Sequence, residues 1–336
     1  MRRTLRAYRN CIPTKGLYTI IRRRYATLEN PTAMPQHIEL IEVGPRDGLQ
    51  NEPQTLSVAT KVELIGRLAA AGLKRIEVAS FVNPKRVPQM ADADQVLATL
   101  PRTAGVRYVG LVLNRKGFDR ALAAGCHEIG MAVVASDTFN RRNQGVGTEE
   151  SIAAWLDIAQ AAHTAGVRAH VTISAAFGCP FEGEVPVNRV IEIAERVAAA
   201  KPDEVCFADT IGVAVPTQVR EILTLARATL PSTRLRCHFH NTRNTGLANA
   251  YAAVEAGAAA LDSSIGGIGG CPFAPAATGN IPTEDLVYLL ERSGIATGAS
   301  LDALIETAKW LENQLGRPVP SMLTKATGQF PRTRAA

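Results

Sequence analysis

An alternation of short β-branched runs with longer amphipathic segments constrains the fold of this chain most. The runs predict strands at 38–43, 75–80, 106–113, 127–136, 168–174, 203–209, 234–240 and 259–265. Amphipathic segments predict helices near 57–71, 92–100, 117–124, 149–165, 187–200, 216–230, 245–256 and 284–293. Four of them end in the same pair, at Ala71-Gly72, Ala124-Gly125, Ala165-Gly166 and Ala256-Gly257. A Gly just past a helix end adopts the left-handed cap conformation at low cost, so these pairs predict helix ends.

Eight strand–helix units without a Pro- or Ser-rich linker predict an α/β fold, a (β/α)8 TIM barrel with an additional C-terminal helix near 301–315. A doubly wound open sheet is the alternative. We expect the catalytic barrel at 35–316, between a basic, disordered extension at 1–34 and a tail at 317–336. A barrel places its chemistry where strands end and their following loops begin.

The positive charge of the chain is concentrated at its N-terminus. Residues 1–30 hold eight Lys and Arg against one Glu, a net charge of +7 within a total of +6. The remaining chain is therefore nearly neutral, and we expect it to bind no nucleic acid. The sequence has no apolar run long enough to span a bilayer. We expect a cytoplasmic protein, or a mitochondrial matrix protein if residues 1–25 are a transit peptide.

Six cysteines without a C-x-x-C pair indicate free thiols in a reducing compartment: Cys11, Cys126, Cys179, Cys206, Cys237 and Cys271. Most of them lie in apolar runs and are expected to be small core residues. Cys271 lies instead in 266-GGIGGCPFAPAATGN-280. This glycine-rich stretch fits either a tight flexible loop or a mobile loop that carries Cys271 over the barrel mouth. Asn280 ends the stretch.

Charged side chains lie just after the first predicted strand and within the second. Arg46 and Asp47 lie on a turn with Gly on both sides, which fits an ordinary Asp-Gly turn with a surface ion pair or a functional site. Glu77 alternates with inward apolar residues of the second strand, so it requires a buried partner. Arg46 is the natural candidate. A purely structural ion pair is equally compatible with this pattern.

His238 and His240 lie at the end of the seventh predicted strand. Residues i and i+2 of a strand point to the same face, so both imidazoles converge on one point. A lone strand histidine is usually a hydrogen-bonded core residue, but two at this spacing favour a metal-ligand pair. An Asp and an Asn oxygen would complete a harder metal site.

These residues together resemble the 3-hydroxy-3-methylglutaryl-CoA (HMG-CoA) lyase family. The resemblance is collinear from about 36 to 315, and its most specific run is Gly-Gly-x-Gly-Gly-Cys-Pro. Other matching runs are 42-EVGPRDGLQNE-52, 80-SFVNPKRVPQMAD-92, 178-GCPFEG-183, 209-DTIGV-213, 238-HFH-240 and 283-TEDLVYLLE-291.

The resemblance implies a barrel that binds Mg²⁺ or Mn²⁺ at its mouth. The implied metal ligands are Asp47, His238, His240 and Asn280. The implied reaction splits a tertiary 3-hydroxy acyl-CoA, such as HMG-CoA, into a keto acid and acetyl-CoA, a step of leucine degradation. The implied partners are an acyl-CoA thioester and a second copy of the chain in a dimer.

The resemblance also implies roles for individual residues in this cleavage. Arg46 stabilises the thioester oxygen, and Glu77 orients Arg46. Asp47 or His238 accepts the hydroxyl proton, and Cys271 protonates the enolate carbon. Substrate contacts are assigned to Ser80 and Asn143. The basic segment 141-RRNQ-144, interpreted as a loop, is either a solvated surface or a contact for CoA phosphates.

Departures from the family pattern keep the acyl group open. Asn241-Thr242-Arg243-Asn244 replaces an Asp-Thr-Tyr-Gly run after the second histidine, and Cys206 stands where a serine is expected. A third departure, that no cysteine follows Cys271, does not bear on the acyl group. Citramalyl-CoA is therefore an alternative substrate. An isopropylmalate- or citramalate-type condensing synthase fits less well, because such enzymes lack the glycine–cysteine loop. A non-catalytic CoA-binding barrel is the remaining alternative.

Overall fold

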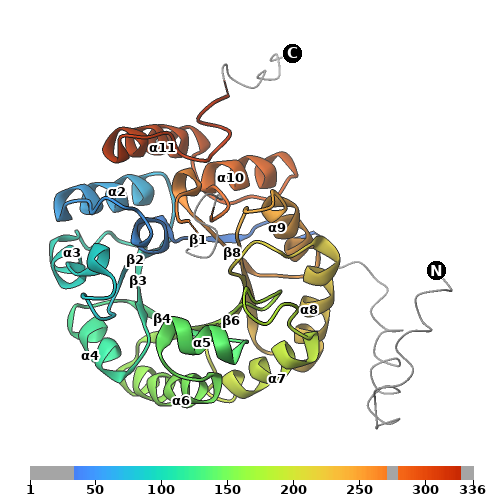
Figure 1. Cartoon of the computed structure of the whole chain (residues 1–336). Coiled ribbons are helices and arrows are strands. Elements are labelled where there is room, and N and C mark those ends of the chain that lie inside the picture. The colour runs from blue at the N-terminus through green and yellow to red at the C-terminus, as the bar shows by residue number, and fades with distance from the viewer. Residues whose placement is uncertain (1–33, 271–278, 327–336) are drawn as a thin grey trace, which may run out of the picture. The chain divides into compact units, whose positions relative to one another are not determined.

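The computed structural model describes residues 34–270 and 279–326. Its strands form one closed parallel barrel in chain order, in which β1 pairs with β8 (Figure 1). The strands are β1 Glu39–Glu42, β2 Arg75–Ser80, β3 Arg107–Val112, β4 Glu128–Val134, β5 Arg168–Ser174, β6 Glu204–Asp209, β7 Arg234–Phe239 and β8 Ala260–Ser263. The barrel prediction is confirmed, and the open sheet is excluded.

Helices surround the barrel on its outside (Figure 1). They are α2 Val58–Ala70, α3 Ala93–Thr99, α4 Arg115–Ala123, α5 Asp137–Gln144, α6 Thr148–Ala165, α7 Val187–Ala198, α8 Pro216–Thr229, α9 Gly246–Glu255, α10 Thr283–Arg292 and α11 Leu301–Leu315. Short turns are the π-helical η2 Gly44–Gly48 and the 3-10 helices η3 Pro88–Met90 and η4 Ile265–Gly267. The glycines of all four Ala-Gly pairs have positive φ, as predicted for helix ends: Gly72, Gly125, Gly166 and Gly257.

The additional C-terminal helix is also confirmed. Helix α11 lies outside the ring, against α2 and α10 (Figure 1). Ser300 caps its first turn by accepting a hydrogen bond from the backbone N–H of Ala303 at 3.4 Å, and Gly316 ends it in the left-handed conformation.

One helix departs from the prediction. The segment 141-RRNQ-144 is the end of helix α5, not a loop. Ser136 caps this helix and Gly145 ends it with a φ of +83°. The helix was missed because it lacks an apolar face, and Figure 1 shows the reason: α5 lies over the barrel mouth, inside the ring.

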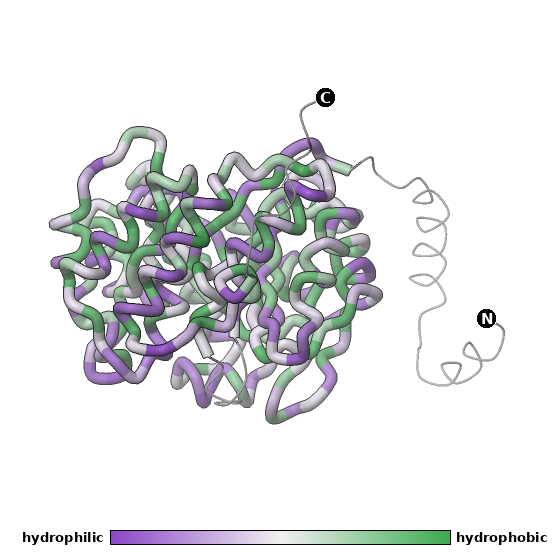
Figure 2. Tube along the Cα trace, turned by 90° about the horizontal axis from the view of Figure 1, so that it is seen from above, coloured by the Kyte–Doolittle hydropathy of each residue, from purple (hydrophilic) through white to green (hydrophobic). Residues whose placement is uncertain are grey.

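Apolar side chains from the outer faces of the strands and the inner faces of the helices form the main core. Along the chain, hydrophobic and hydrophilic residues alternate over short distances, as Figure 2 shows. Among the described cysteines, Cys126, Cys179, Cys206 and Cys237 are buried free thiols, as expected. None of the described helices has the length and apolar character needed to cross a membrane.

The barrel interior, in contrast, holds a network of charged residues. Arg75 is fully buried and pairs with Glu128 at 3.0 Å and with Glu204 at 2.6 Å. His170 Nδ1 lies 2.7 Å from Glu128 Oε1. Burial alone would raise the pKa of Glu128, but His170 and Arg75 outweigh it and hold that pKa well below its usual range. The carboxylates are therefore ionised and depend on the buried cations beside them.

Arg75→Met tests this dependence. The variant leaves Glu128 and Glu204 buried with less compensating charge, so we expect its free energy of unfolding to fall by about 3–5 kcal/mol. Arg220→Met is the matched control, since Arg220 pairs with Glu255 at 2.7 Å on the surface. The control should lose less than about 1 kcal/mol. Urea unfolding followed by circular dichroism measures both, and equal losses would contradict the interpretation.

Candidate active site

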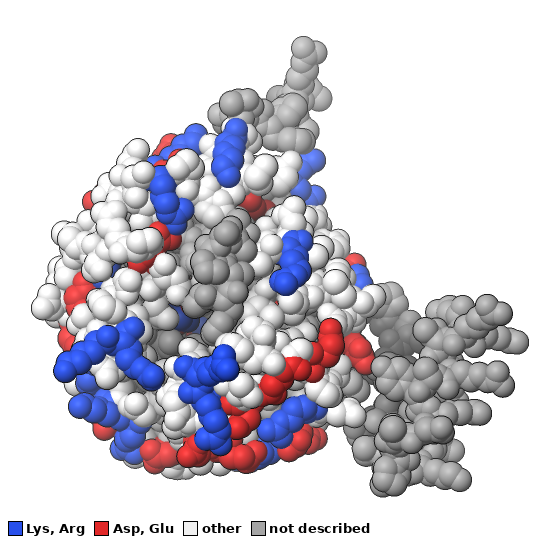
Figure 3. Space-filling model, viewed as in Figure 1, with Lys and Arg blue, Asp and Glu red and all other residues white. Residues whose placement is uncertain are grey.

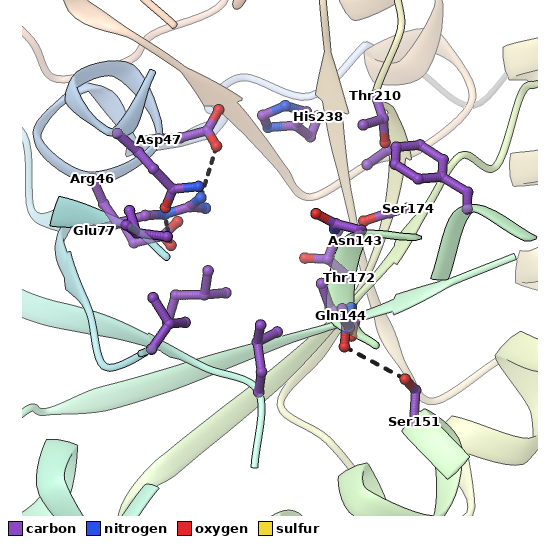
Figure 4. A pocket seen from close by; sticks show the side chains of 18 of the residues that line it. Arg46, Asp47, Glu77, Asn143, Gln144, Ser151, Thr172, Ser174, Thr210 and His238 are labelled. Atoms are coloured by element: carbon purple, nitrogen blue, oxygen red, sulfur yellow. Dashed lines mark hydrogen bonds and ion pairs between the residues drawn. The ribbon is translucent and has the colours of Figure 1, made fainter. Parts of the chain in front are cut away.

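A cavity of about 620 Å³ opens at the carboxyl ends of the strands. Its walls come from η2, from the strands β2, β5, β7 and β8, and from helix α5 (Figure 4). Figure 3 shows Lys and Arg side chains distributed around this face of the molecule. Two of the cations that line the cavity are Arg86 and Arg142. The side chains predicted to carry the chemistry at the strand ends therefore line a cavity whose wall also holds basic side chains.

Arg46 and Glu77 form the predicted ion pair. Arg46 Nε donates to Glu77 Oε1 at 2.5 Å, and Arg46 Nη1 donates to Asp47 Oδ1 at 2.7 Å. Figure 4 shows the three side chains together at one wall of the cavity. Two carboxylates thus fix the guanidinium, whose remaining N–H groups are available to a ligand.

Asp47, His238 and His240 offer ligand atoms that lie within 4.8 Å of one another. His238 Nδ1 is 3.2 Å from Asp262 Oδ2. Because a carboxylate only accepts hydrogen bonds, Nδ1 carries the proton and Nε2 remains as the ligand atom. The arrangement can bind a cation with two imidazoles and one carboxylate.

Asn280 adds a fourth donor to this group. Its Nδ2 donates to Asp47 Oδ2 at 2.8 Å and to the backbone oxygen of Ile268 at 3.1 Å. Its Oδ1 is buried and has no hydrogen-bond partner among the described residues, and the same holds for His240 Nδ1. Buried polar atoms without a partner are costly, so these two fit the ligand shell of a cation.

Electrostatics favours the cation-binding protonation state for two of the three groups, Asp47 and His240. Burial would raise the pKa of Asp47, but the charges of Arg46, His238 and His240 hold it well below its usual range. Burial, reinforced by the charge of His238, lowers the pKa of His240 to about 3. Burial would also lower the pKa of His238, but the hydrogen bond and charge of Asp262 outweigh it, so this pKa is raised. Asp47 is therefore ionised and His240 neutral near pH 7.

The glycine-rich stretch approaches Asn280 closely. Gly269 has a φ of +108°, and a Cβ on this residue would lie 2.5 Å from Asn280 Nδ2 and 3.1 Å from the Cα of Gly48. A glycine is therefore required here for close approach, independently of any loop motion. Gly270 lines the cavity. Cys271 follows at once and lies outside the described residues.

The two predicted substrate contacts have different positions. Asn143, on α5, lines the cavity and is labelled in Figure 4. Ser80 is buried at the end of β2, and it does not belong to the described residues that line this cavity. Arg142, from the predicted basic segment, lines the cavity, whereas Arg141 pairs with Asp137 at 2.8 Å.

Several polar side chains of the cavity were not predicted from the sequence, and three of them lie beside or below His238. They are Thr172 on β5, Arg236 on β7 and Asp262 on β8. Asp262, on β8, contacts two residues of the neighbouring strand β7: its Oδ1 lies 3.3 Å from Arg236 Nε, and its Oδ2 lies 3.2 Å from His238 Nδ1. A period-two reading of strand β7 would have found Arg236, because it precedes His238 by two residues.

The profile of the HMGL-like family matches residues 37–311, which include the whole barrel. The chain belongs to the HMGL-like family. This membership confirms the resemblance found in the sequence.

Relatives in this family cover nearly the whole length of the chain. The (R)-citramalyl-CoA lyase of Chloroflexus aurantiacus is 46% identical, over 88% of this chain and 96% of the relative. The hydroxymethylglutaryl-CoA lyase of Pseudomonas mevalonii is 43% identical, over 84% and 93%. A solved HMG-CoA lyase from Acinetobacter baumannii, in complex with coenzyme A and 3-methylmalate, has a TM-score of 0.84 at 40% identity, over 90% and 100%.

The run 241–244, which departs from the pattern expected for this HMGL-like protein, is fixed by local contacts beside His240. Asn241 N donates to the backbone oxygen of Gly279 at 2.6 Å, next to Asn280. Arg243 Nη1 donates to backbone oxygens of Ile211 and Gly212, both at 3.0 Å. The run thus connects the loops that follow three barrel strands, and of these contacts only those of Arg243 depend on a side chain of the departure.

A buried glutamate holds the loop after β8 to the end of β1. Glu42 Oε1 accepts hydrogen bonds from the backbone N–H groups of Gly44 and Ile265, both at 2.8 Å. Its Oε2 accepts from Thr283 Oγ1, the first residue of α10, at 2.6 Å. Burial raises the pKa of Glu42 to about 7. Glu284 Oε2 likewise accepts from Gly266 N at 3.0 Å.

The neighbouring Glu284 yields a prediction about pH. Burial raises its pKa from the usual 4.5 to about 8, so the folded state holds a proton that the unfolded state releases in this range. The stability that this proton contributes is complete below about pH 4.5 and is lost as the pH rises to about 8. Glu284→Gln cannot titrate.

We therefore expect Glu284→Gln to gain stability relative to the wild type between about pH 5 and pH 8.5, by an amount on the order of 3–5 kcal/mol. Glu306→Gln, on an exposed position of α11, is the control and should follow the wild-type curve. Urea midpoints across this pH range provide the measurement. Parallel curves for all three proteins would show that Glu284 does not titrate in this way.

Proposed function

We propose that this protein is a divalent-metal-dependent carbon–carbon lyase. It cleaves a 3-hydroxy acyl-CoA with a free carboxylate into a keto acid and acetyl-CoA. The observation that carries the proposal is the convergence of Asp47, His238, His240 and Asn280 beside Arg46 at one barrel mouth. Membership of the HMGL-like family supports the same reaction class.

The residues of the cavity match the needs of this cleavage. Bound Mg²⁺ or Mn²⁺ would be held by the four donors and would lower the pKa of the substrate hydroxyl. Asp47 and His238 are the two candidate acceptors of that proton, and His238 can accept it only while its Nε2 is not bound to the metal. When the C2–C3 bond breaks, its electron pair forms the enolate of acetyl-CoA. Arg46, held by Glu77, donates hydrogen bonds to the enolate oxygen.

Protonation of the enolate carbon completes the reaction. We assign this step to Cys271, whose predecessor Gly270 lines the cavity. A thiol suits the step because its pKa lies within reach of neutral pH. Asn143, on α5 at the same cavity, is assigned to a substrate contact, and Arg142 to the CoA end of the substrate, where phosphates lie.

HMG-CoA is the first candidate substrate, because several relatives carry this activity in their names. Citramalyl-CoA is the second, favoured by the 46% identity to a citramalyl-CoA lyase and by the departure at 241–244. Both have a tertiary 3-hydroxyl and a free carboxylate, so the same residues serve either one.

Acetyl-CoA release tests the proposal. We expect the purified protein with Mg²⁺ or Mn²⁺ to cleave at least one of the two thioesters. EDTA should abolish the cleavage and added metal should restore it. Cys271→Ala should lose about 10²–10⁴-fold in rate while it still binds metal. Absence of acetyl-CoA release from both thioesters would contradict the proposed function.

Asp262 is expected to position a metal ligand. In Asp262→Asn the amide can donate to His238 Nδ1, which stabilises the wrong tautomer, so we expect Mn²⁺ to bind about 10–100-fold more weakly. Asp203→Asn is the matched control, because Asp203 precedes β6 and pairs with Arg168. Mn²⁺ titration followed by electron paramagnetic resonance gives both affinities. An unchanged Kd in Asp262→Asn would remove Asp262 from this role.

A further inference from the structure

Arg236 is a buried cation in the cavity wall whose hydrogen-bonding capacity is largely unused. Its side chain is 3% exposed. Nη2 donates to Thr172 Oγ1 at 3.3 Å. Nε and Nη1 are buried and have no hydrogen-bond partner in the described part of the chain. A guanidinium has five N–H donors, and a buried donor that makes no hydrogen bond lowers the stability of the folded state.

The charged groups around Arg236 do not satisfy these donors. Asp262 Oδ1 lies 3.3 Å from Nε, and Glu204 Oε2 lies 3.6 Å from Nη1, as ion pairs without hydrogen-bond geometry. His170 also faces the guanidinium, and the Cys206 thiol makes a side-chain contact with it that does not meet the geometry of a hydrogen bond to Nε or Nη1. The two carboxylates compensate the charge of Arg236 without accepting hydrogen bonds from Nε and Nη1.

Arg75 shows what a purely structural arginine looks like in the same barrel. It shares Glu204 with Arg236 but makes close contacts to Glu204 and Glu128, at 2.6 and 3.0 Å. Arg75 does not line the cavity, whereas Arg236 does. The need to neutralise Glu128 and Glu204 inside the barrel therefore does not explain why Arg236 lies in the cavity wall.

Arg236 also lies deeper in the barrel than His238, one of the metal-ligand candidates, by one inward-facing position of β7. It precedes His238 by two residues on β7, so both side chains point into the barrel, with Cα atoms about 6.6 Å apart. Asp262 contacts both residues. If a small acid binds beside His238, the end of the acid that lies deeper in the barrel would therefore contact the Arg236 guanidinium.

We propose that Arg236 binds the free carboxylate of the substrate and thereby selects acids over neutral acyl-CoA thioesters. The inference rests on the proposed function and deepens it. Carboxylate and guanidinium form charge-assisted hydrogen bonds, and Nη1 can donate one of them in parallel with the N–H of Nη2 that points the same way. Thr172 holds the guanidinium from the other side. Arg46 contacts the thioester end, so the two arginines hold the two ends of the acyl group.

The test compares a thioester substrate that has its free carboxylate with the methyl ester of that carboxylate. Wild-type protein should cleave the free acid with a kcat/KM at least about 10–100-fold above that of the ester, the range expected for hydrogen bonds to a charged group. Arg236→Gln should lose this preference, through a fall for the acid and little change for the ester. Arg236→Lys should keep part of it.

Arg234→Gln is the matched control. Arg234 lies on the same strand and also contacts Glu204, at 3.0 Å, but it does not line the cavity within the described residues. The control should keep the wild-type preference. The Mn²⁺ affinity of Arg236→Gln, measured without substrate, should stay within about threefold of the wild type, since a role through Asp262 would weaken it.

Equal losses for acid and ester in Arg236→Gln, or a loss that follows Mn²⁺ affinity, would overturn the inference. So would a wild type that cleaves both compounds equally well. If Arg236→Gln does not fold, Arg236→Lys and the wild-type preference decide. If the wild type cleaves neither HMG-CoA nor citramalyl-CoA, the proposed function fails by itself. Calorimetric titration of acetoacetate and pyruvate into Mn²⁺-loaded wild type and Arg236→Lys then tests carboxylate binding separately, and equal affinities would overturn it.

Discussion

The pairing of β1 with β8 is the constraint on which the site depends. It brings the first strand beside the last, so that Asp47 and Asn280, 233 residues apart, share a hydrogen bond of 2.8 Å. Glu42 strengthens the same junction, since one carboxylate accepts backbone hydrogen bonds from both sides of it. An open sheet would separate these ends, and the two histidines at the end of β7 would lose Asp47 as a neighbour. Closure of the barrel is thus a condition for the chemistry as well as for the fold.

Much of this arrangement could be predicted from the sequence, because it follows from short-range rules. Strand and helix periodicity, with the Ala-Gly pairs as stops, gave the order of the barrel elements. The i, i+2 spacing placed His238 and His240 on one face. The need of a buried Glu77 for a cation pointed to Arg46, and the two form a hydrogen bond of 2.5 Å.

The features that were not predicted depend on neighbours distant in sequence. Helix α5 has the cap signals Ser136 and Gly145, but its lack of an apolar face hid it, since a helix over a barrel mouth has little core to contact. Asp262 lies in an ordinary strand sequence, and its contact with His238 arises only from the pairing of β7 with β8. The isolated sequence cannot distinguish such a residue from a structural acid. Its role requires the register between strands.

Arg75 and Arg236 show how one residue type serves stability and recognition within the same barrel. Both are buried and both contact Glu204, whose carboxylate offsets part of the repulsion between their charges. Arg75 is enclosed by carboxylates, which fixes it and the strands around it. Arg236 lines the cavity and keeps two N–H donors without a hydrogen-bond partner among the described residues, which lowers stability. The carboxylates that stabilise Arg75 in the interior therefore also stabilise Arg236. N–H donors without a hydrogen-bond partner distinguish Arg236, the proposed recognition residue, from the structural Arg75.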